Sequence, residues 1–327
     1  MNLEPVCPEC RIKPDPAGDG SLKCRQCGNL FRNSADFRDF RVSSLPGDRI
    51  RDEWDADQFD RVYSAALDSF EDGFAHSAKQ GIPDFIECYR QRFLKNRIAE
   101  WITTPDDKNC AVRGKVLDIG CGHGWFGYRL VSDYGFRGEL YGVDISPFNI
   151  NLYMKKITME KINNIFPFAA YAEKLPFSND SFDLAFATET LEHTASPQLF
   201  FQEAWRVLKP GGELIITTPS SGMCRFWEAF FFIPRIIYRL FSNKRSVAEN
   251  VFDKPLPWRT IRDAAENAGF SIVFHTKSIF LPHESYIRFF PRIAQKIMLW
   301  KAVLFEHLKP FSTPFGLHHI IRLEKRV

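Results

Sequence analysis

The chain has 327 residues, of which 45% are hydrophobic and 25% are charged, as in an average folded globular protein. This composition excludes a disordered chain, collagen and a plain coiled coil, and the length allows one large domain or two. The formal charge of +3 gives no argument for a polyanionic partner.

Four cysteines near the N-terminus form two CxxC pairs, Cys7 with Cys10 and Cys24 with Cys27. The spacing lets each pair hold one side of a tetrahedral ion, and four thiolates suit zinc. Because all four ligands are cysteines, no position is left for water, and the predicted zinc is structural. The alternative is four unrelated buried thiols. We expect residues 1–45 to form a zinc ribbon.

Residues 46–110 follow as an expected helical linker and cap. Residues 84–101 carry apolar side chains three and four positions apart, which predicts an amphipathic helix. The N-terminus lacks the charged start and apolar run of a signal peptide, and no window of about 18 uninterrupted apolar residues occurs. We therefore expect a cytoplasmic protein.

Short apolar runs alternate with segments of helical length from residue 115 onward. The runs are VLDIG at 116–120, LYGVD at 140–144, FDLAFAT at 182–188 and ELIITT at 213–218. Apolar runs separated by helices indicate buried parallel strands with crossover connections. The sequence therefore predicts a doubly wound α/β fold for residues 111–327.

A glycine-rich turn follows the first run, in the order Asp118-Ile-Gly120-Cys-Gly122-His-Gly124. Glycines there let the backbone approach a ligand and turn into a helix whose N-terminus faces the site. The same glycines fit a dinucleotide fingerprint, with Asp144 about 20 residues further on. Asp144 can accept the ribose hydroxyls of either kind of cofactor. A tight turn without a ligand is the remaining alternative.

Four motifs together indicate which of the two cofactors this site binds. They are VLDIGCGHGWFG, YGVDIS, AEKLPFSNDSFDLAFATETLEH and RVLKPGGELIITTP. Their order and spacing resemble the class I S-adenosylmethionine-dependent methyltransferases, most closely the quinone-biosynthesis and small-molecule branch. The resemblance is dense over residues 116–219. It implies a Rossmann-like, mostly parallel sheet of seven strands.

The resemblance also implies a cofactor site. In that site Asp118 binds the methionine ammonium, Asp144 holds the ribose and Ile145 flanks the adenine. The full implied set is Asp118, Gly120, Cys121, Gly122, Gly124, Asp144, Ile145, Ala172, Glu173 and Thr188. This sequence departs from the family pattern at Tyr171, because the family often has an acidic residue at this position that contacts the adenine amine.

His193, in the motif LEHT, is the candidate catalytic residue, because it lies where the family's substrate enters. A neutral imidazole there could remove a proton from a hydroxyl or an activated carbon acid as the methyl is transferred. Alternatively, Glu192 and His193 cap the next helix or pack the loop, and some members of the family work by proximity alone. For His318 and His319 we expect core or surface roles.

The C-terminal third completes the expected fold with a helix at 257–268, a strand at 270–280 and an antiparallel strand at 318–324. Two insertions, 222–255 and 282–314, interleave aromatic and aliphatic residues with Arg and Lys. Residues 222–327 hold 17 basic and 8 acidic side chains. Such segments lie in a membrane interface or roof an apolar pocket.

The first hypothesis is therefore a methyltransferase for a hydrophobic or lipid-linked small molecule, with peripheral membrane contact. The second is a ribosomal- or transfer-RNA methyltransferase, because a four-cysteine ribbon ahead of this fold also resembles bacterial ribosomal-RNA guanine methyltransferases. Residues 1–50 carry 8 basic and 7 acidic side chains, so their net positive charge is weak evidence for binding to the phosphate backbone of a nucleic acid. The third is a non-catalytic zinc-ribbon interaction protein with a degenerate cofactor site.

Overall fold

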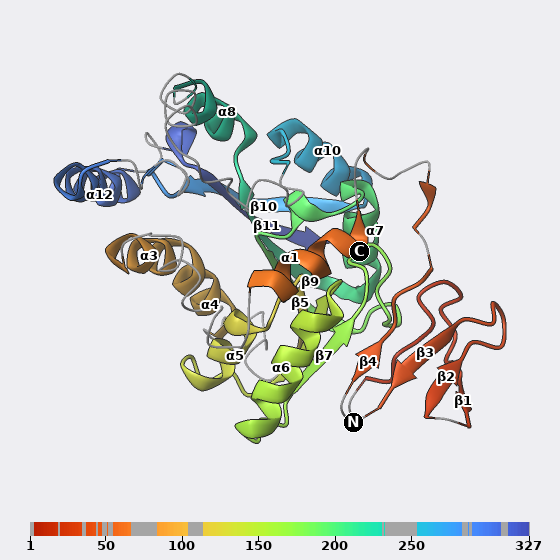
Figure 1. Cartoon of the computed structure of the whole chain (residues 1–327). Coiled ribbons are helices and arrows are strands. Elements are labelled where there is room, and N and C mark those ends of the chain that lie inside the picture. The colour runs from red at the N-terminus through yellow and green to blue at the C-terminus, as the bar shows by residue number, and fades with distance from the viewer. Residues whose placement is uncertain are drawn as a thin grey trace.

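The structure is a computed structural model with one mixed β-sheet at its centre (Figure 1). It describes residues 3–18, 20–34, 37–43, 45–47, 51, 55–66, 84–103, 114–230, 232, 254–282, 287, 290–308 and 313–326. The N-terminal strands are β1 (Asp15–Ala17), β2 (Ser21–Lys23), β3 (Leu30–Asn33) and β4 (Arg38–Asp39). The others are β5 (Lys115–Ile119), β6 (Glu139–Asp144), β7 (Ile165–Ala169), β8 (Phe182–Thr188), β9 (Leu208–Pro219), β10 (Phe270–Ser278) and β11 (His318–Lys325).

Five parallel strands in the order β7-β6-β5-β8-β9 form the centre of the sheet, and the antiparallel pair β11-β10 completes one side. The central strands are almost wholly buried because helices cover both faces, which is why their sequences are continuous apolar runs. The predicted doubly wound α/β fold is confirmed. The predicted helix and two strands of the C-terminal third also form.

Among the described residues the sheet has eleven strands: β5 to β11 correspond to the predicted seven, and the four N-terminal strands continue the sheet beyond β7. Strand β4 joins β7 in parallel at Asp39 and Ala169, and the Phe40 N–H donates to the Ala169 carbonyl over 2.8 Å. Without β4, the outer side of β7 would be an open edge with unpaired backbone groups. The N-terminal residues therefore extend the central sheet.

Strand β7 was not among the four predicted apolar runs, and it contains a proline, a residue that is disfavoured at an internal strand position. Pro167 lies in its middle. The Ala170 N–H donates to Asp144 of β6, whereas Ala169 faces β4. Residues two apart in a strand direct their backbone groups toward the same neighbouring strand. Pro167, two residues before Ala169, therefore faces away from β6, and its missing N–H removes no hydrogen bond to β6.

The sheet separates two apolar clusters. One contains Leu117 and Ile119 together with side chains of α7 (Pro197–Val207) and α10 (Trp258–Asn267). The other contains Val116 with side chains of α4 (Asn96–Thr103), α5 (Trp125–Ser132) and α6 (Pro147–Met159). Cys7, Cys24, Phe31 and Phe40 belong to the first cluster, so the N-terminal ribbon shares a core with the sheet.

A third apolar cluster lies beside the ends of β10 and β11 and joins α3 (Asp84–Arg90) to α12 (Arg292–His307). Figure 1 shows both helices at the side of the molecule opposite the N-terminal strands. The predicted helix at 84–101 forms as α3, a π-helical turn η2 (Gln91–Lys95) and α4. Of the two insertions, α8 (Ser221–Phe230) and α12 are described, whereas residues 233–253, including Arg235 and Arg239, lie outside the described residues. In the part of the chain that the structure describes, no helix could cross a membrane.

Candidate functional site

The glycine-rich turn connects β5 to α5 in the left-handed backbone region. Gly120, Gly122 and Gly124 have φ angles of 77°, 56° and 83°. A Cβ at Gly120 would lie 2.2 Å from the Thr190 side chain, and one at Gly124 would lie 2.2 Å from the Tyr153 ring. At Gly122 a Cβ would meet nothing within 4 Å. Close packing therefore requires two of the glycines, and the third borders open space that a ligand can fill.

Cys121 lies between these glycines and ties the turn to β6. The N–H groups of Gly120 and Cys121 both donate to the Val143 carbonyl, over 2.7 and 2.9 Å. The thiol packs over Gly142, where a Cβ would lie 3.0 Å from the sulfur. Burial raises the pKa of this thiol, and the nearby carboxyl groups of Asp118 and Asp144 raise it further. Cys121 is therefore a neutral wall of the site and not a thiolate nucleophile.

Asp118, the penultimate residue of β5, is 2% exposed. Neither carboxylate oxygen has a hydrogen-bond partner among the described residues. Burial, and secondarily Asp144, raises its pKa well above the usual range. A buried carboxyl group without a partner is costly unless a cation or donor satisfies it. The ammonium of a methionine moiety is such a group, so the site fits the cofactor implied by the sequence.

Asp144 ends β6 and accepts three hydrogen bonds from its own surroundings. The donors are Gly122 N and Ser146 N, each at 2.9 Å, and Asn149 Nδ2 at 3.4 Å. Burial raises its pKa, while these bonds and the charge of His193 oppose that rise. The carboxylate thus fixes the glycine turn beside the end of β6, where the family resemblance implies that the ribose of the cofactor binds.

The other expected cofactor residues lie at the carboxyl edge of the sheet or in the loops beyond it. Ile145 directly follows β6 and Thr188 ends β8, and both are partly exposed. Ala172 is partly exposed in the loop after β7. Glu173 is buried, and its Oε1 accepts the N–H groups of residues 195–196 over 2.6 and 3.2 Å. Glu173 therefore also anchors the loop that carries His193.

The loop after β8 connects the glycine turn to the candidate acceptor side. Thr190 Oγ1 donates to the Gly120 carbonyl over 3.5 Å. The 3₁₀ turn η4 (Leu191–His193) follows, and Arg51 holds it by donating to the Glu192 carbonyl over 2.7 Å. His193 packs against the Phe59 ring, with centroids 5.8 Å apart, and its charge acts on Asp144. His193 therefore lies between the candidate ribose site and the cavity beyond it.

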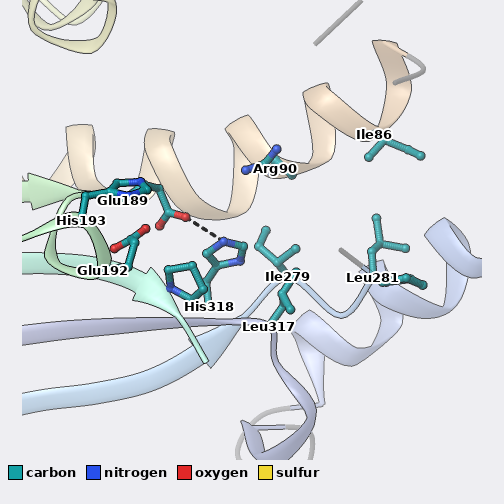
Figure 2. A pocket seen from close by; sticks show the side chains of 11 residues that line it. Ile86, Arg90, Glu189, Glu192, His193, Ile279, Leu281, Leu317 and His318 are labelled. Atoms are coloured by element: carbon teal, nitrogen blue, oxygen red, sulfur yellow. Dashed lines mark ion pairs between the residues drawn. The ribbon is translucent and has the colours of Figure 1, made fainter. Parts of the chain in front are cut away.

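That cavity, of about 200 Å³, is lined in part by residues of this loop (Figure 2). Its polar lining includes Glu189, Glu192, His193, His318 and Arg90, whereas Ile86, Ile279, Leu281 and Leu317 form an apolar wall. The cavity is smaller than typical pockets of about 300–1,000 Å³ for whole small molecules. It therefore suits the reacting end of a ligand whose remainder extends along the apolar wall.

An ion pair between Glu189 and His318 crosses the polar part of the cavity. Glu189 Oε2 lies 2.8 Å from His318 Nε2, and only 4% of the His318 side chain is exposed. Burial alone would raise the pKa of Glu189. The charge and hydrogen bond of His318, together with the charge of Arg90, outweigh burial and lower that pKa to about 2. Glu189 is thus an ionised carboxylate.

Sequence reasoning missed Glu189, His318 and Arg90, which come from three distant parts of the chain. Glu189 follows a predicted strand end, and this position was the one available signal. His318 reaches the cavity because β11 lies between β9 and β10, a position that only the assembled sheet determines. Arg90 ends α3 next to the π-helical turn, and such turns occur frequently at functional sites.

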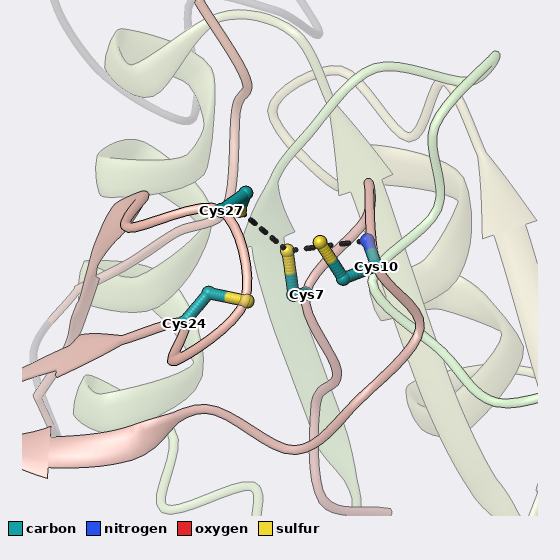
Figure 3. A group of neighbouring side chains, drawn as sticks. All are labelled: Cys7, Cys10, Cys24 and Cys27. Atoms are coloured by element: carbon teal, nitrogen blue, oxygen red, sulfur yellow. Dashed lines mark hydrogen bonds between the residues drawn. The ribbon is translucent and has the colours of Figure 1, made fainter.

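The four N-terminal cysteines converge as the spacing predicts (Figure 3). Their Sγ atoms all lie within 4.8 Å of one another, and those of Cys7 and Cys27 are 3.6 Å apart. Zn–S bonds of about 2.3 Å in a tetrahedron place sulfur atoms roughly 3.8 Å apart. Arg11 N donates to the Cys7 carbonyl and Gly28 N to the Cys24 carbonyl, so both CxxC segments form the same turn. The donor set and geometry fit zinc.

Comparison with known proteins identifies the family. A family described as a methyltransferase domain matches residues 112–279, which is just over half of the chain. The chain belongs to this methyltransferase family. The matched segment begins just before β5 and ends just after β10, so it contains the glycine turn, Asp144 and the loop with His193.

Curated methyltransferases align with about half of the chain or less. The ubiquinone/menaquinone biosynthesis C-methyltransferase UbiE of Bartonella bacilliformis is 30% identical over 168 residues, 48% of this chain and 60% of the relative. The malonyl-[acyl-carrier protein] O-methyltransferase of Hahella chejuensis is 35% identical over 127 residues, 38% of this chain and 43% of the relative. The chain thus spans roughly half the length of these relatives.

Among solved structures, the geranyl diphosphate C-methyltransferase of Streptomyces coelicolor matches with a TM-score of 0.48 and 14% identity, covering 75% of this chain and 85% of that one. A phosphoethanolamine N-methyltransferase of Haemonchus contortus matches with a TM-score of 0.46 and 18% identity, covering 80% of this chain and 61% of that one.

Proposed function

We propose that this chain is an S-adenosylmethionine-dependent methyltransferase that methylates a hydrophobic or lipid-linked small molecule. The observation that carries the proposal is the loop after β8. Its Thr190 contacts the glycine turn, and its residues Glu189, Glu192 and His193 line the cavity. A cofactor held by the turn and an acceptor in the cavity would therefore meet at this loop.

S-adenosylmethionine supplies a methyl group on a positively charged sulfur. Asp118 would bind its ammonium group, Asp144 would hold its ribose, and Gly122 leaves room for its methionine chain. Holding the acceptor atom about 3 to 3.5 Å from the methyl and in line with it can supply much of the rate acceleration. His193, between Asp144 and the cavity, stays the sequence-based prediction for a base.

The apolar wall of the cavity supports a hydrophobic acceptor. Ile86, Ile279, Leu281 and Leu317 offer no polar side-chain atom to a ligand, so a hydrocarbon group gains by contact with them. The names of relatives point the same way, since they include a sterol 4-C-methyltransferase of Caenorhabditis elegans, 31% identical over 160 residues, besides UbiE.

We also propose that α12 docks on an anionic membrane surface. Its outward face exposes Ile293, Ile297, Trp300, Leu304 and Leu308, of which Ile293 is 76% and Trp300 67% exposed. Arg292, Lys296 and Lys301 are exposed on the same helix, while its acidic residue Glu306 points inward to Tyr89 and Ser278. An apolar stripe flanked only by basic residues complements an anionic lipid surface. The helix belongs to the same apolar cluster as Ile86 and Leu281 of the cavity wall.

We propose that the four cysteines hold one structural zinc ion. All four ligand positions are filled by thiolates, so the ion would have no open site for catalysis.

Transfer of labelled methyl to fractionated lipid, RNA and protein from the source cell tests the function, alongside calorimetry with S-adenosylmethionine. We expect cofactor binding and label in the lipid fraction. Label in RNA that decreases with salt would favour the RNA hypothesis instead. If S-adenosylmethionine does not bind at millimolar concentration, the remaining hypothesis is the third one, a non-catalytic zinc-ribbon interaction protein.

Sedimentation with vesicles containing an anionic lipid tests the docking surface. Attraction amounts to about 1 kcal/mol per basic residue near such a surface. The double variant Lys296→Glu with Lys301→Glu should therefore bind at least about tenfold more weakly than wild type. The matched control is Lys155→Glu with Lys161→Glu, two exposed lysines, the first within α6 and the second just after it. Equal binding of both variants, or no binding of wild type at low salt, would contradict the docking surface.

A further inference from the structure

We infer that the N-terminal ribbon positions the loop after β7 through Arg11, so that the affinity for S-adenosylmethionine depends on the ribbon. This loop, residues 170–177, is called the adenine loop below, because the family resemblance implies that its residues Ala172 and Glu173 border the adenine. The inference rests on the proposed function. It gives the ribbon a part in cofactor binding besides the zinc ion.

Three consecutive residues of the adenine loop contact the ribbon, through one ion pair and two hydrogen bonds. The contacts are Glu9 with Lys174 at 3.1 Å, Arg11 Nη1 with the Leu175 carbonyl at 3.3 Å, and Val6 N with the Pro176 carbonyl at 3.0 Å. The Lys174 N–H donates to the Tyr171 carbonyl over 3.1 Å, which closes the turn that contains Ala172 and Glu173. The ribbon therefore holds the residues that directly follow this turn.

Arg11 holds the loop with both prongs of its guanidinium group. Besides the bond from Nη1 to Leu175, Nη2 lies 2.7 Å from Glu203 Oε1 of α7. Glu203 Oε2 accepts the Leu175 N–H over 2.8 Å. Arg11 and Glu203 thus bind both backbone groups of Leu175, whose side chain is fully buried. The planar guanidinium can make this forked contact, whereas the single ammonium of a lysine cannot.

The first CxxC turn determines where Arg11 lies. Arg11 directly follows Cys10, has a φ angle of 60° in the left-handed region, and donates its N–H to the Cys7 carbonyl over 2.8 Å. A non-glycine residue adopts this conformation only where its surroundings require it. The same turn brings the thiols of Cys7 and Cys10 together. A zinc ion bound by them would keep the turn closed and Arg11 in place.

A loop that leaves its bound arrangement part of the time lowers the apparent affinity for its ligand in proportion. The adenine loop would pass such a change on, because Glu173 Oε1 accepts the N–H groups of Ala195 and Ser196 over 2.6 and 3.2 Å. These two residues follow the turn η4 that carries His193. The ribbon is thus connected through one loop to the candidate cofactor site and to the loop after β8.

Hydrogen exchange of the cofactor-free full chain, measured by mass spectrometry, tests the coupling independently of cofactor binding. The double variant Glu9→Ala with Arg11→Ala removes the side-chain contacts from the ribbon to the loop. It should fold, because Arg206 still pairs with Glu203 at 2.9 Å and no carboxylate is left buried alone. We expect peptides that cover residues 171–177 to exchange about tenfold faster than in wild type.

The matched control is Glu4→Ala with Lys13→Ala, which removes an ion pair of the same ribbon whose two side chains are 69% and 65% exposed. Exchange of the adenine loop at the wild-type rate in the first variant, or equally faster exchange in both, would overturn the inference. If the first variant does not fold, Arg11→Lys replaces it. It keeps the charge beside Glu203 but not the forked contact, so a wild-type rate there would overturn the inference as well.

Calorimetry measures the consequence for the cofactor. We expect Glu9→Ala with Arg11→Ala to bind S-adenosylmethionine at least about fivefold more weakly than wild type and the matched control. Adenosine should lose affinity by a similar factor, because it lacks the methionine part and keeps the adenine. Unchanged affinity for both ligands, or a loss for S-adenosylmethionine alone, would contradict the role of Arg11. Absence of S-adenosylmethionine binding by wild type would instead contradict the proposed function, and hydrogen exchange would still test the link between ribbon and loop.

Discussion

Single residues differ in how far the sequence reveals them. Asp118 lies near the end of one predicted strand and Asp144 ends the next, and parallel strands place such residues at one edge of the sheet, so motif and position agree. Glu189 and His318 are 129 positions apart in the chain and meet only after β11 has inserted beside β9. No local spacing could indicate that pair. The sequence thus predicts the candidate cofactor half of the site and misses most of the candidate acceptor half.

Asp118→Asn should weaken S-adenosylmethionine binding by at least about tenfold while stabilising the cofactor-free protein. The pKa of Asp118 is raised in the folded protein, so the folded protein keeps this proton at pH values at which the unfolded chain has released it. Stability therefore falls as the pH rises above about 4. Asparagine removes this dependence. Thermal unfolding at pH 5 and 8 and calorimetry would check both effects, with Asp57→Asn on the surface of α1 (Ala56–Ala66) as the control. A lower melting temperature of Asp118→Asn at pH 8 would refute the expectation.

Whole elements were predicted well where apolar periodicity alone determines them. Helix α10 and strands β5, β6, β8, β10 and β11 agree with the predicted segments to within a few residues. The prediction missed β7, where Pro167 faces the outer side of the strand and its missing N–H removes no bond to β6. It also gave no sign that β10 and β11 would bring His275 and His319 together, since that contact depends on the register between them.

The pair β10 and β11 should make the stability of the protein depend on pH in the acidic range. His275 Nε2 lies 2.8 Å from His319 Nδ1, and the His275 ring stacks on Trp258 with centroids 3.7 Å apart. Burial lowers the pKa of His275 to about 4 and that of His319 to about 3. In the unfolded chain these histidines take up protons near pH 6.5. The stability that the folded protein gains from keeping them neutral is therefore complete above pH 6.5 and is lost as the pH falls toward 3.

Urea unfolding between pH 7 and 4 measures this loss, with a slope of up to about 1.4 kcal/mol per pH unit for each histidine. His275→Phe keeps the stack on Trp258 and removes one titrating group, so we expect a shallower slope. Replacing the exposed His307 of α12 in the same way is the control. A slope in His275→Phe as steep as in wild type would show that other groups cause the acid sensitivity.

At the scale of the whole molecule, the N-terminal ribbon is less separate than its cysteine spacing suggests. Phe31 and Phe40 stack at 5.0 Å, Phe40 contacts Phe168 of β7, and Arg11 pairs with Glu203 of α7 at 2.7 Å. These contacts link the ribbon to both the sheet and a covering helix. Cysteine spacing predicts how the four thiols converge, but it carries no information about the surface on which the ribbon packs.

Replacing Cys7 and Cys10 by serine should remove one zinc ion per chain and destabilise the whole molecule, not the first 45 residues alone. A structural zinc supplies folding free energy to its ribbon, and this ribbon shares a core with the sheet. We expect elemental analysis to show the loss and thermal unfolding to show one lowered transition. An unchanged transition of the remaining chain would mean that the ribbon folds independently, and wild-type protein without zinc would contradict the metal site.

The pairing of β4 with β7 also sets an order of events during synthesis. The ribosome completes the ribbon about 130 residues before Ala169, its partner in the sheet, emerges. Until then Phe31 and Phe40 have no central sheet to cover them, so the nascent ribbon presents an apolar surface and depends for its shape on its four thiols and its own short strands. If the four thiols hold zinc as proposed, cells short of zinc should lose this protein at translation, through aggregation or degradation of unfinished chains, before any shortage affects finished molecules.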